Sequence, residues 1–373
     1  MSWRECALGE VVHFQRGHDL PDQDRKPGDI PVIGSAGPNG WHNESRATGP
    51  GVSIGRSGAS IGKVTYTAVD YWPHNTCLYV TNFHGNNPRF VYYFLKTKDF
   101  VSLNSGAAQP SLNRNFVHVV LVRVPGPNEQ AVIADILSAY DDLIENNRRR
   151  IALLEEAARM LYREWFVSFR FPGHEHVKIF DGIPVGWARR MLHQVVNVVT
   201  ETAKPGEFKA SDVHIGLEHI PRRSFTLADW ESTEGLASHK IRFVEGDIIF
   251  GKIRPYFHKV GFALLDGVAS SDALVWRVKD TQDWPLVVCT TSSDHFVAVS
   301  SKTVREGSKM PRADWNVLKN YLVPGPPDGL LAAFNDTMLP IIQQCRTLAL
   351  QNRVLTEARD LLLPRLMNGE IAV

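Results

Sequence analysis

The sequence has few features of secreted, membrane or metal-binding proteins. It contains four cysteines in 373 residues, and none of them belongs to a CxxC pair. Without such a pair, or a His/Cys cluster at ligand spacing, no structural zinc site is expected. The N-terminal MSWRECALGE has no apolar signal core, and no apolar run reaches the roughly 18 residues of a membrane span. We therefore expect buried, reduced cysteines and a cytoplasmic location.

The sequence also lacks an excess of charge. The 41 Lys and Arg residues against 40 Asp and Glu leave a formal net charge of +1. Total charge does not report how charges are distributed over faces, so this balance neither indicates nor excludes nucleic-acid binding. The length, with 43% hydrophobic and 22% charged residues, is typical of a globular protein of two or three domains.

A long internal repeat is the strongest positive feature. GVSIGRSGASIGKV (51–64) matches DIIFGKIRPYFHKV (247–260), which aligns Gly55 with Gly251 and Lys63 with Lys259. Two further pairs keep the same order: WRECALGEVV with WARRMLHQVV, and GAAQPSLNRNFVHVVLVRVPGP (106–127) with GSKMPRADWNVLKNYLVPGPP (307–327). A unit this long repeated once predicts duplicated domains with pseudo-two-fold symmetry rather than a solenoid.

Short apolar runs bounded by turn residues predict strands within each repeat. They are 51–54, 63–67, 78–80, 243–250, 260–265 and 273–278. Residues 88–97 predict a short helix with proline in its first turn, and 285–290 its weaker counterpart. Each domain is therefore expected to be mixed α/β and rich in strands. The strand order does not follow from the sequence.

A long helix is predicted to follow each domain. From Ile133 to Trp165 the apolar residues recur at alternating spacings of four and three, which is an unbroken heptad seam. We expect this helix to cover 128–166. Its opposite face should be solvated. That face carries Asp141, Asp142, Glu145, Arg148, Arg149, Glu155, Glu156 and Arg159.

The second seam runs from Leu331 to Leu366. Arg359 interrupts it, and Pro340 is expected to kink or restart the helix because proline removes a backbone donor. If the helices pack antiparallel with Ile133 opposite Leu366, Asn147 falls opposite Asn352. One polar residue from each seam would then pair and set the register. The alternative is two unrelated asparagines.

Two such helices have a mechanical interpretation. A helix of about 33 residues is on the order of 50 Å long. The pair could act as a spacer that sets two recognition surfaces one to two DNA turns apart. The alternative is a coiled coil that provides only dimerisation or rigidity.

Three segments resemble catalytic motifs but lack essential residues. GASIGKV (58–64) has neither the first glycine nor the Ser/Thr of a phosphate-binding loop. PDQDRK (21–26) lacks a second carboxylate-bearing strand for a metal nuclease. Residues 86–89 have arginine where an adenine methyltransferase motif needs an aromatic residue. We therefore expect no catalytic centre and no metal in this chain.

Basic and amide residues gather in loops at matching positions of the two repeats. These side chains can contact phosphates or form hydrogen bonds with base edges. Arginine and lysine donate to guanine, and glutamine and asparagine pair with adenine. The candidates in the first repeat are Arg56, Lys63, Gln109, Asn113, Arg114 and Asn115; those in the second are Lys252, Arg254, Lys259, Lys302, Arg305, Lys309 and Arg312. For any one of them the alternative is a solvated surface charge. Because the two loop sets differ in chemistry, a bipartite, asymmetric target is expected.

The chain resembles the specificity subunits of type I restriction–modification systems. The resemblance covers nearly the whole chain and rests on the ordered repeat, on PNEQAVIADILSAYDDLIENNRRRIALLEEAARMLYREWF, and on the ending LLLPRLMNGEI. It implies a non-catalytic subunit that binds double-stranded DNA at two half-sites. It also implies two methyltransferase subunits that carry S-adenosylmethionine and restriction subunits that join afterwards. The charged outer faces of the helices are candidate docking surfaces for the methyltransferase subunits.

The expected organisation is two duplicated α/β target-recognition domains separated by two long antiparallel coiled-coil helices. The domains are assigned to 1–127 and 169–327, and the helices to 128–168 and 328–373. The helix-rich pattern alone leaves a second hypothesis open, a structural coiled-coil adaptor that does not read DNA. A methyltransferase or nuclease fused to its own reader is disfavoured by the missing cofactor and metal motifs.

Overall fold

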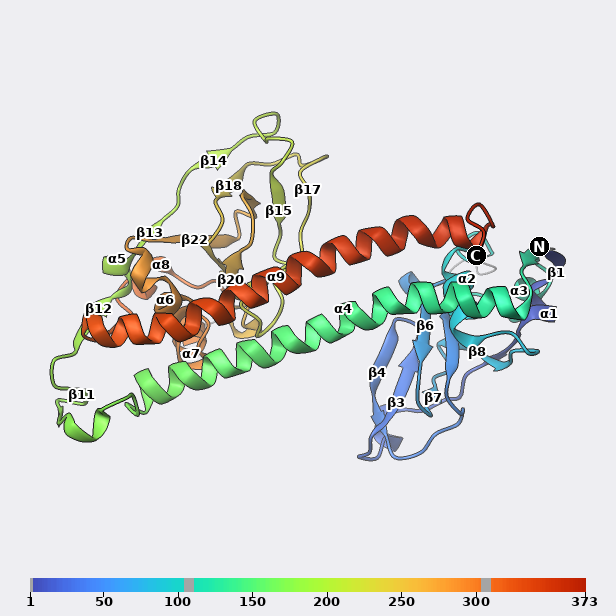
Figure 1. Ribbon diagram of the computed structural model, residues 1–373, viewed down its shortest axis with the longest axis horizontal. Helices are drawn as coiled ribbons and strands as arrows, with labels where there is room; N and C mark the ends of the chain where they lie inside the picture. Colours follow the sequence, from blue (N-terminus) through green and yellow to red (C-terminus); the bar gives the residue numbers. More distant parts are fainter. Residues whose placement is uncertain (1–2, 104–110, 303–309) are drawn as a thin grey trace. The chain divides into compact units, whose positions relative to one another are not determined.

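The structure is a computed structural model that describes residues 3–103, 111–302 and 310–373. It divides into two compact units, residues 1–144 with 355–373, and residues 145–354. Two long helices contribute to both units, α4 (Pro127–Tyr162) and α9 (Asp328–Met367). Each unit therefore contains one domain of strands and short helices together with a section of each long helix (Figure 1). The expected boundaries, in contrast, placed both helices outside the domains.

The first unit is built on a four-stranded antiparallel sheet with the order β2-β8-β5-β6. Its strands are β2 (His13–Arg16), β8 (Cys77–Asn82), β5 (Gly51–Gly55) and β6 (Val64–Thr67). A second sheet has the order β4-β3-β7, with β3 (Ile30–Gly34), β4 (Gly37–His42) and β7 (Trp72–Pro73). A third pairs β1 (Arg4–Ala7) with β9 (Leu121–Val124). The short helices are α1 (Leu8–Val11), α2 (Pro88–Lys96) and α3 (Arg114–His118).

The second unit repeats this plan with additional strands. Its main sheet has the order β13-β22-β19-β20-β16, from β13 (Val196–Val198), β22 (Ala273–Val278), β19 (Ile248–Gly251), β20 (Val260–Ala263) and β16 (Thr226–Leu227). The other has the order β14-β18-β21-β15-β17, from β14 (Thr202–Ala203), β18 (Lys240–Phe243), β21 (Gly267–Ala269), β15 (Val213–Ile215) and β17 (Glu231–Ser232). Two further antiparallel pairs are β12 (Ala188–Met191) with β23 (Leu322–Gly325), and β10 (Ile179–Phe180) with β11 (Ile183–Pro184). The short helices are α5 (Leu192–Val195), α6 (Trp284–Thr291), α7 (Asp294–Lys302) and α8 (Trp315–Leu318).

The strand register confirms the duplication residue by residue. Gly55 of β5 faces Cys77 of β8, and Gly251 of β19 faces Ala273 of β22. A register shifted by one residue would turn every side chain to the opposite face of the sheet. Because the aligned residues pair in the same register, the two units have the same strand pairing. The expected strand over 243–250 was wrong in one respect. Gly246, with φ of 85°, forms a turn between β18 and β19.

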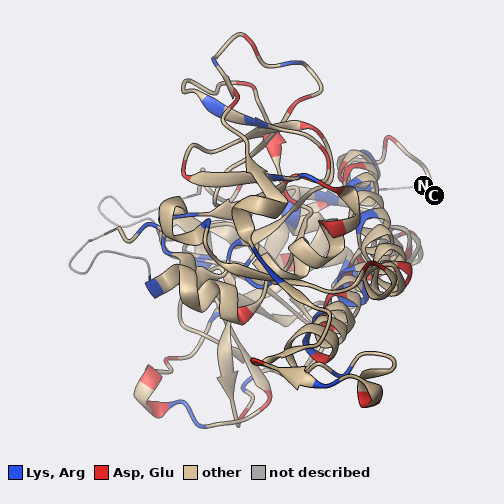
Figure 2. Ribbon diagram, turned by 90° about the vertical axis from the view of Figure 1, so that its left-hand side faces the viewer, with Lys and Arg blue, Asp and Glu red and all other residues tan. Residues whose placement is uncertain are grey.

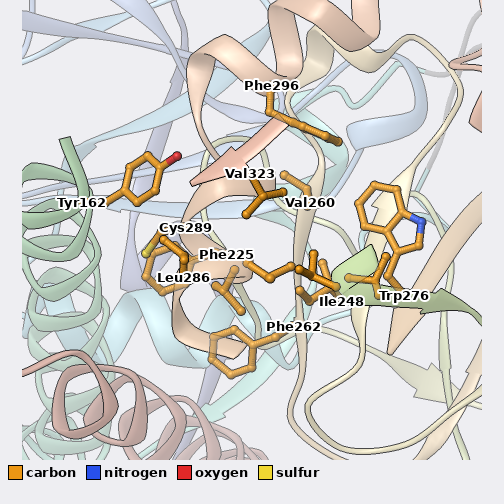
Figure 3. Close-up of a cluster of buried hydrophobic side chains, with 14 of the residues drawn as sticks. Tyr162, Phe225, Ile248, Val260, Phe262, Trp276, Leu286, Cys289, Phe296 and Val323 are labelled. Atoms are coloured by element: carbon orange, nitrogen blue, oxygen red, sulfur yellow. The ribbon is translucent and has the colours of Figure 1, made fainter. Parts of the chain in front are cut away.

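The largest buried cluster of the second unit joins its main sheet to the short helices α5, α6, α7 and α8 and to the two long helices (Figure 3). Trp276 of β22 stacks on Phe250 of β19, and both are fully buried. Phe296 of α7 meets the two rings edge-on, and Tyr162 brings α4 into the same cluster. Each fully buried aromatic side chain stabilises the fold by about 1.5–3 kcal/mol. The domain and its section of the long helices therefore share one core.

Helices α4 and α9 pack antiparallel within each unit. In the first unit, Ile133 and Leu137 of α4 share a core with Leu363 and Leu366 of α9. In the second, Trp165 contacts Phe334, whereas Asn147 meets Asn352 further along both helices. The expected restart at Pro340 was wrong, because α9 is continuous from Asp328 to Met367. Pro340 lies on the exposed side, where water can satisfy the carbonyl that proline leaves unpaired.

The expectation of a fully solvated outer face on α4 was also wrong at three positions. Of these, Arg159 has a side chain only 25% exposed, which donates to the Arg223 carbonyl. Glu155 is 2% exposed and accepts hydrogen bonds from the Ser224 hydroxyl and from the backbone and hydroxyl of Thr226. Asp141 accepts hydrogen bonds from Tyr93 of α2 and from Arg359 of α9. These two carboxylates tie the helices to their domains, one in each unit.

Candidate nucleic-acid interface

The candidate interface begins at the turn that follows the central strand of each sheet. The backbone N–H of Gly55 donates to the Lys63 carbonyl at 2.9 Å, and Gly251 donates to Lys259 at 2.9 Å. These hydrogen bonds close a loop of matching length in the two repeats. A side chain at position 55 could not be accommodated, because a Cβ there would lie 2.1 Å from the Ser60 carbonyl oxygen.

A second loop lies against each of these turns. In the first unit, Ser57 bridges to Ser111, and the Leu112 N–H donates to the Arg56 carbonyl at 2.8 Å. In the second unit, Ile253 bridges to Arg312 in the same way. The structure thus places Arg56 beside the start of α3, where Asn113 is the cap and Arg114 and Asn115 are the first helical residues. These two residues therefore lie in a helix rather than in the expected loop. It likewise places Lys252 and Arg254 beside Arg312. The pairing of loops far apart in the sequence is the same in both repeats.

Several predicted DNA contacts of the first unit have structural partners. Arg56 donates to the Asn75 carbonyl and the Ser111 hydroxyl, both at 3.3 Å, and burial lowers its pKa. Asn113 caps α3, because its Oδ1 accepts the Asn115 N–H at 3.0 Å. Lys63, Arg114 and Asn115 are exposed. These three, together with Asn113, whose side chain also caps α3, are the exposed candidates in the described part of this unit.

The second unit shows the same division between engaged and accessible cations. Lys252 donates to the Ser271 carbonyl at 2.5 Å, and Lys259 donates to the Leu217 carbonyl. Burial lowers the pKa of Lys259. Arg312 pairs with Asp272 at 3.1 Å but keeps 55% of its side chain exposed. Arg254 is exposed beside it, and Lys302 is exposed at the end of α7. Gln109, Arg305 and Lys309 lie outside the described residues.

Lys and Arg segments alternate with Asp and Glu segments along the ribbon (Figure 2). The candidate contacts described above are the cations beside the two equivalent turns, which could meet phosphates or base edges.

Sequence reasoning missed two residues beside the turn of the second unit. Tyr256 follows Arg254 and keeps 55% of its surface exposed. Arg222, from a distant loop, holds its guanidinium 4.1 Å from the Phe257 ring centre. Because only basic and amide side chains were expected to contact DNA, the sequence did not indicate Tyr256. The proximity of Arg222 depends on tertiary packing, and no sequence signal identified it.

One side-chain cluster in the second unit has the composition of a metal site. His214, His219 and Glu231 bring one ligand atom each within 4.8 Å of one another. However, the Gly216 N–H donates to Nδ1 of His219 at 3.0 Å, so the neutral ring carries its proton on Nε2 and cannot bind a metal there. His214 Nδ1 lies 2.7 Å from the Glu231 carboxylate, and this hydrogen bond lowers the pKa of Glu231. In this arrangement the three side chains link β15 to β17.

A cavity of about 740 Å³ in the second unit lies apart from the candidate DNA contacts. Its lining includes Gly246 in the turn before β19, Trp284 of α6, and Asn335 and Leu339 of α9. None of its lining residues is a predicted DNA contact. Separately, none of the helices in the described part of the chain is both long and apolar enough to span a membrane.

Comparisons with known proteins agree with this arrangement. Residues 2–156 match the family described as "Type I restriction modification DNA specificity domain". The chain is 25% identical over 305 residues to the type I restriction enzyme MjaIX specificity subunit of Methanocaldococcus jannaschii, covering 76% of this chain and 69% of that protein. It is 24% identical over 362 residues to the EcoDI specificity subunit of Escherichia coli, covering 88% and 78%.

A solved structure extends the likeness to the whole fold. The alignment with the S subunit of a type I restriction–modification system from M. genitalium covers 98% of this chain and 96% of that subunit, at a TM-score of 0.64 and 14% identity. This likeness shows the fold, which consists of two mixed α/β domains and two long seam helices. Residues 2–156 thus match the DNA specificity domain of type I restriction–modification systems, and most of the chain is similar to specificity subunits of such systems.

Proposed function

We propose that each domain of this chain reads one half of a bipartite, asymmetric duplex target and so specifies the DNA sequence for a type I restriction–modification assembly. The observation that carries the proposal is the pair of equivalent turns with different side chains. After β5 the turn reads Arg-Ser-Gly-Ala-Ser, and after β19 it reads Lys-Ile-Arg-Pro-Tyr. Equivalent backbones with different chemistry would read different bases.

The chain acts as a non-catalytic subunit within this proposal. Two of the three segments that resembled catalytic motifs have structural roles. Asn87 caps α2 by accepting the N–H groups of Arg89 and Phe90. The glycine-rich segment 58–64 forms the turn between β5 and β6. Methyl transfer with S-adenosylmethionine is assigned to a partner methyltransferase subunit. The adaptor hypothesis, in which the chain would not read DNA, is less favoured because it leaves the duplicated loops without a role.

Partner subunits are proposed to dock on the outer faces of α4 and α9. Several apolar side chains on these helices are exposed, among them Leu153 at 71%, Val354 at 64% and Leu361 at 71%. Docking of a partner there would remove these apolar side chains from water, which favours association. The assembly includes other restriction–modification subunits and DNA, and we propose two methyltransferase subunits for each copy of this chain, with restriction subunits joining afterwards.

The test of sequence reading is the methylation pattern. The full chain, co-expressed with its methyltransferase in a host free of adenine methylation, is expected to direct methylation to one bipartite motif with a constant spacer, which long-read sequencing detects. Methylation without sequence preference would contradict the proposal.

If Arg114 contacts a phosphate, Arg114→Ala should weaken binding to all duplexes alike. It should also reduce the salt dependence of binding by about one phosphate contact.

The test of docking is the composition of the co-expressed complex. Native mass spectrometry is expected to find two methyltransferase subunits per chain. Leu153→Lys should reduce their binding, whereas Val69→Lys, at a residue 58% exposed in a loop of the first domain, should not. One methyltransferase subunit, or equal effects of both variants, would argue against this arrangement.

A further inference from the structure

The turns after β5 and β19 share an unusual backbone. In the first unit, Gly58 and Gly62 adopt φ of 68° and 80°. At the equivalent positions of the second unit, Arg254 and His258 adopt φ of 49° and 54°. The second repeat therefore keeps a left-handed geometry that favours glycine while using two residues with large side chains. For residues other than glycine this conformation is uncommon, and the surrounding structure must hold it against its strain.

His258 has a structural reason to be there. It is 6% exposed, and its Nε2 lies 2.8 Å from the Ser292 carbonyl. Its backbone carbonyl accepts the Arg223 N–H at 3.0 Å. His258 thus anchors the turn to the corner between α6 and α7.

Arg254 has no comparable structural reason within the described residues. Its backbone N–H donates to the Pro311 carbonyl at 2.7 Å, which every residue except proline could do. Its guanidinium lies 5.9 Å from the Phe257 ring, makes no hydrogen bond or ion pair with the described part of the chain, and is exposed. A glycine would relieve the strain without losing the backbone contact. The backbone contact therefore does not explain the arginine at this position, which leaves its side chain as the reason.

Tyr256 lies two residues further along the same turn. Its ring is 4.9 Å from that of Phe257 at an interplanar angle of 70°, and 55% of Tyr256 remains exposed. Arg222 covers Phe257 from a neighbouring loop. The turn thus presents an aromatic ring with guanidinium groups nearby on a backbone held at Pro311, Arg223 and Ser292. The first repeat has Ser60 at the corresponding position and cannot present such a ring.

We propose that Tyr256 is a specificity-determining residue of the second domain that packs against a base in the target duplex, with Arg254 hydrogen-bonding the edge of a neighbouring base. This inference rests on the proposed function and assigns the reading element of one domain. A rigid aromatic side chain supplies apolar contact to a base or a thymine methyl group, and arginine donates to guanine O6 and N7. The first domain must read its half-site through other side chains.

The experiment uses the full chain co-expressed with its methyltransferase and reads the methylated motif. Tyr256→Ala should relax the base preference at one or two adjacent positions of one half-site by about 10-fold or more, and leave the other half-site unchanged. Tyr256→Phe, which keeps the ring, should retain the preference. Phe180→Ala removes an aromatic residue that is 77% exposed in the β10–β11 hairpin and serves as the matched control. An unchanged motif with Tyr256→Ala would overturn the inference, as would uniform weakening at all sites.

Arg254→Gly separates a reading role from a structural one. Glycine relieves the left-handed strain, so the melting temperature of the Arg254→Gly variant should equal or exceed that of the parent chain. Its base preference should fall in the half-site that Tyr256→Ala affects. A lower melting temperature with unchanged preference would overturn the role of Arg254. If Tyr256→Ala methylates nothing, competition between target and scrambled duplexes decides: a lost preference supports the inference and a retained one overturns it. Absence of any sequence preference in the parent complex would instead refute the proposed function.

Discussion

The side-chain amide of Asn147 donates a hydrogen bond of 3.0 Å to Oδ1 of Asn352, which joins α4 to α9 within the second unit. Asn147 is 2% exposed, so this polar pair lies inside an otherwise apolar seam. The heptad spacing predicts this contact, and the structure contains it. We propose that the pair sets the register of the two helices, as a single polar seam residue does in other coiled coils.

Replacing one member of this pair should cost more than replacing both. Asn147→Leu leaves Asn352 facing an apolar side chain in the seam, and we expect a loss of about 1–3 kcal/mol in the free energy of unfolding. The double variant with Asn352→Leu should regain most of that loss, because two apolar residues need no partner. Denaturant unfolding of the four proteins gives the coupling energy. Additive losses would show that the two side chains do not interact.

The carboxylate of Asp141 is expected to matter for stability in the first unit. It accepts hydrogen bonds from Tyr93 and Arg359, and the Arg359 side chain is 15% exposed. Although burial opposes the charge on Arg359, its hydrogen bonds to Asp141 and Asp360 raise its pKa. Asp141→Asn should destabilise the fold by about 1–3 kcal/mol because it leaves a largely buried guanidinium poorly compensated.

The control for that variant is an exposed pair on the same helix. Arg149 and Glu145 lie 3.0 Å apart with side chains 75% and 51% exposed. Glu145→Ala should change the free energy of unfolding by less than about 0.5 kcal/mol, because solvent screens such pairs. Equal effects of the two substitutions in denaturant unfolding would mean that Asp141 has no special role.

The equivalent glycines of the two repeats should tolerate alanine differently. At Gly55 a Cβ would lie 2.1 Å from the Ser60 carbonyl oxygen and 2.4 Å from that of Ser35, so the backbone must move. At Gly251 its nearest neighbours would be 3.3 Å away, at Leu217 and Lys259. Gly55→Ala should therefore cost roughly 2–4 kcal/mol and Gly251→Ala less than about 1 kcal/mol. Thermal melting of the two variants checks the order, and a larger effect at Gly251 would contradict it.

The first unit should lose stability in mild acid because of His118. The Phe14 N–H donates to Nε2 of His118 at 2.9 Å, which requires an unprotonated nitrogen. Burial lowers the pKa of His118, and the nearby His13 and Arg114 lower it further. Below about pH 6.5 the unfolded chain therefore binds more protons than the folded chain. The stabilisation from this hydrogen bond is fully present above that pH and is lost as the pH drops through the pKa of His118 in the folded chain.

His118→Gln tests this directly, because a glutamine carbonyl can accept the same N–H without titrating. Unfolding free energies measured between pH 5 and 8 should depend less on pH in the variant than in the parent chain. His258 in the second unit, whose pKa burial also lowers, supplies a background that is the same in both proteins. Identical pH profiles would remove His118 as a cause.

The sequence by itself determined the features that depend on local periodicity. Heptad spacing predicted two seam helices and the pairing of Asn147 with Asn352, because each helix repeats its contacts every two turns. Ordered repetition predicted duplicated domains, and glycine-bounded apolar runs located most strands. Individual base contacts did not follow, since the same arginine can bind a phosphate, a base or its own protein.

Only the tertiary structure decided which polar side chains are engaged inside the protein. Glu155 has the spacing of a solvated helix position, yet Ser224 and Thr226 from a distant loop and strand enclose it. Lys259 has the chemistry of a DNA contact, yet its amine donates to Leu217. Burial of these groups depends on which segments pack against them. That packing is set by residues far away in the chain, whereas periodicity records only the face of a single helix or strand.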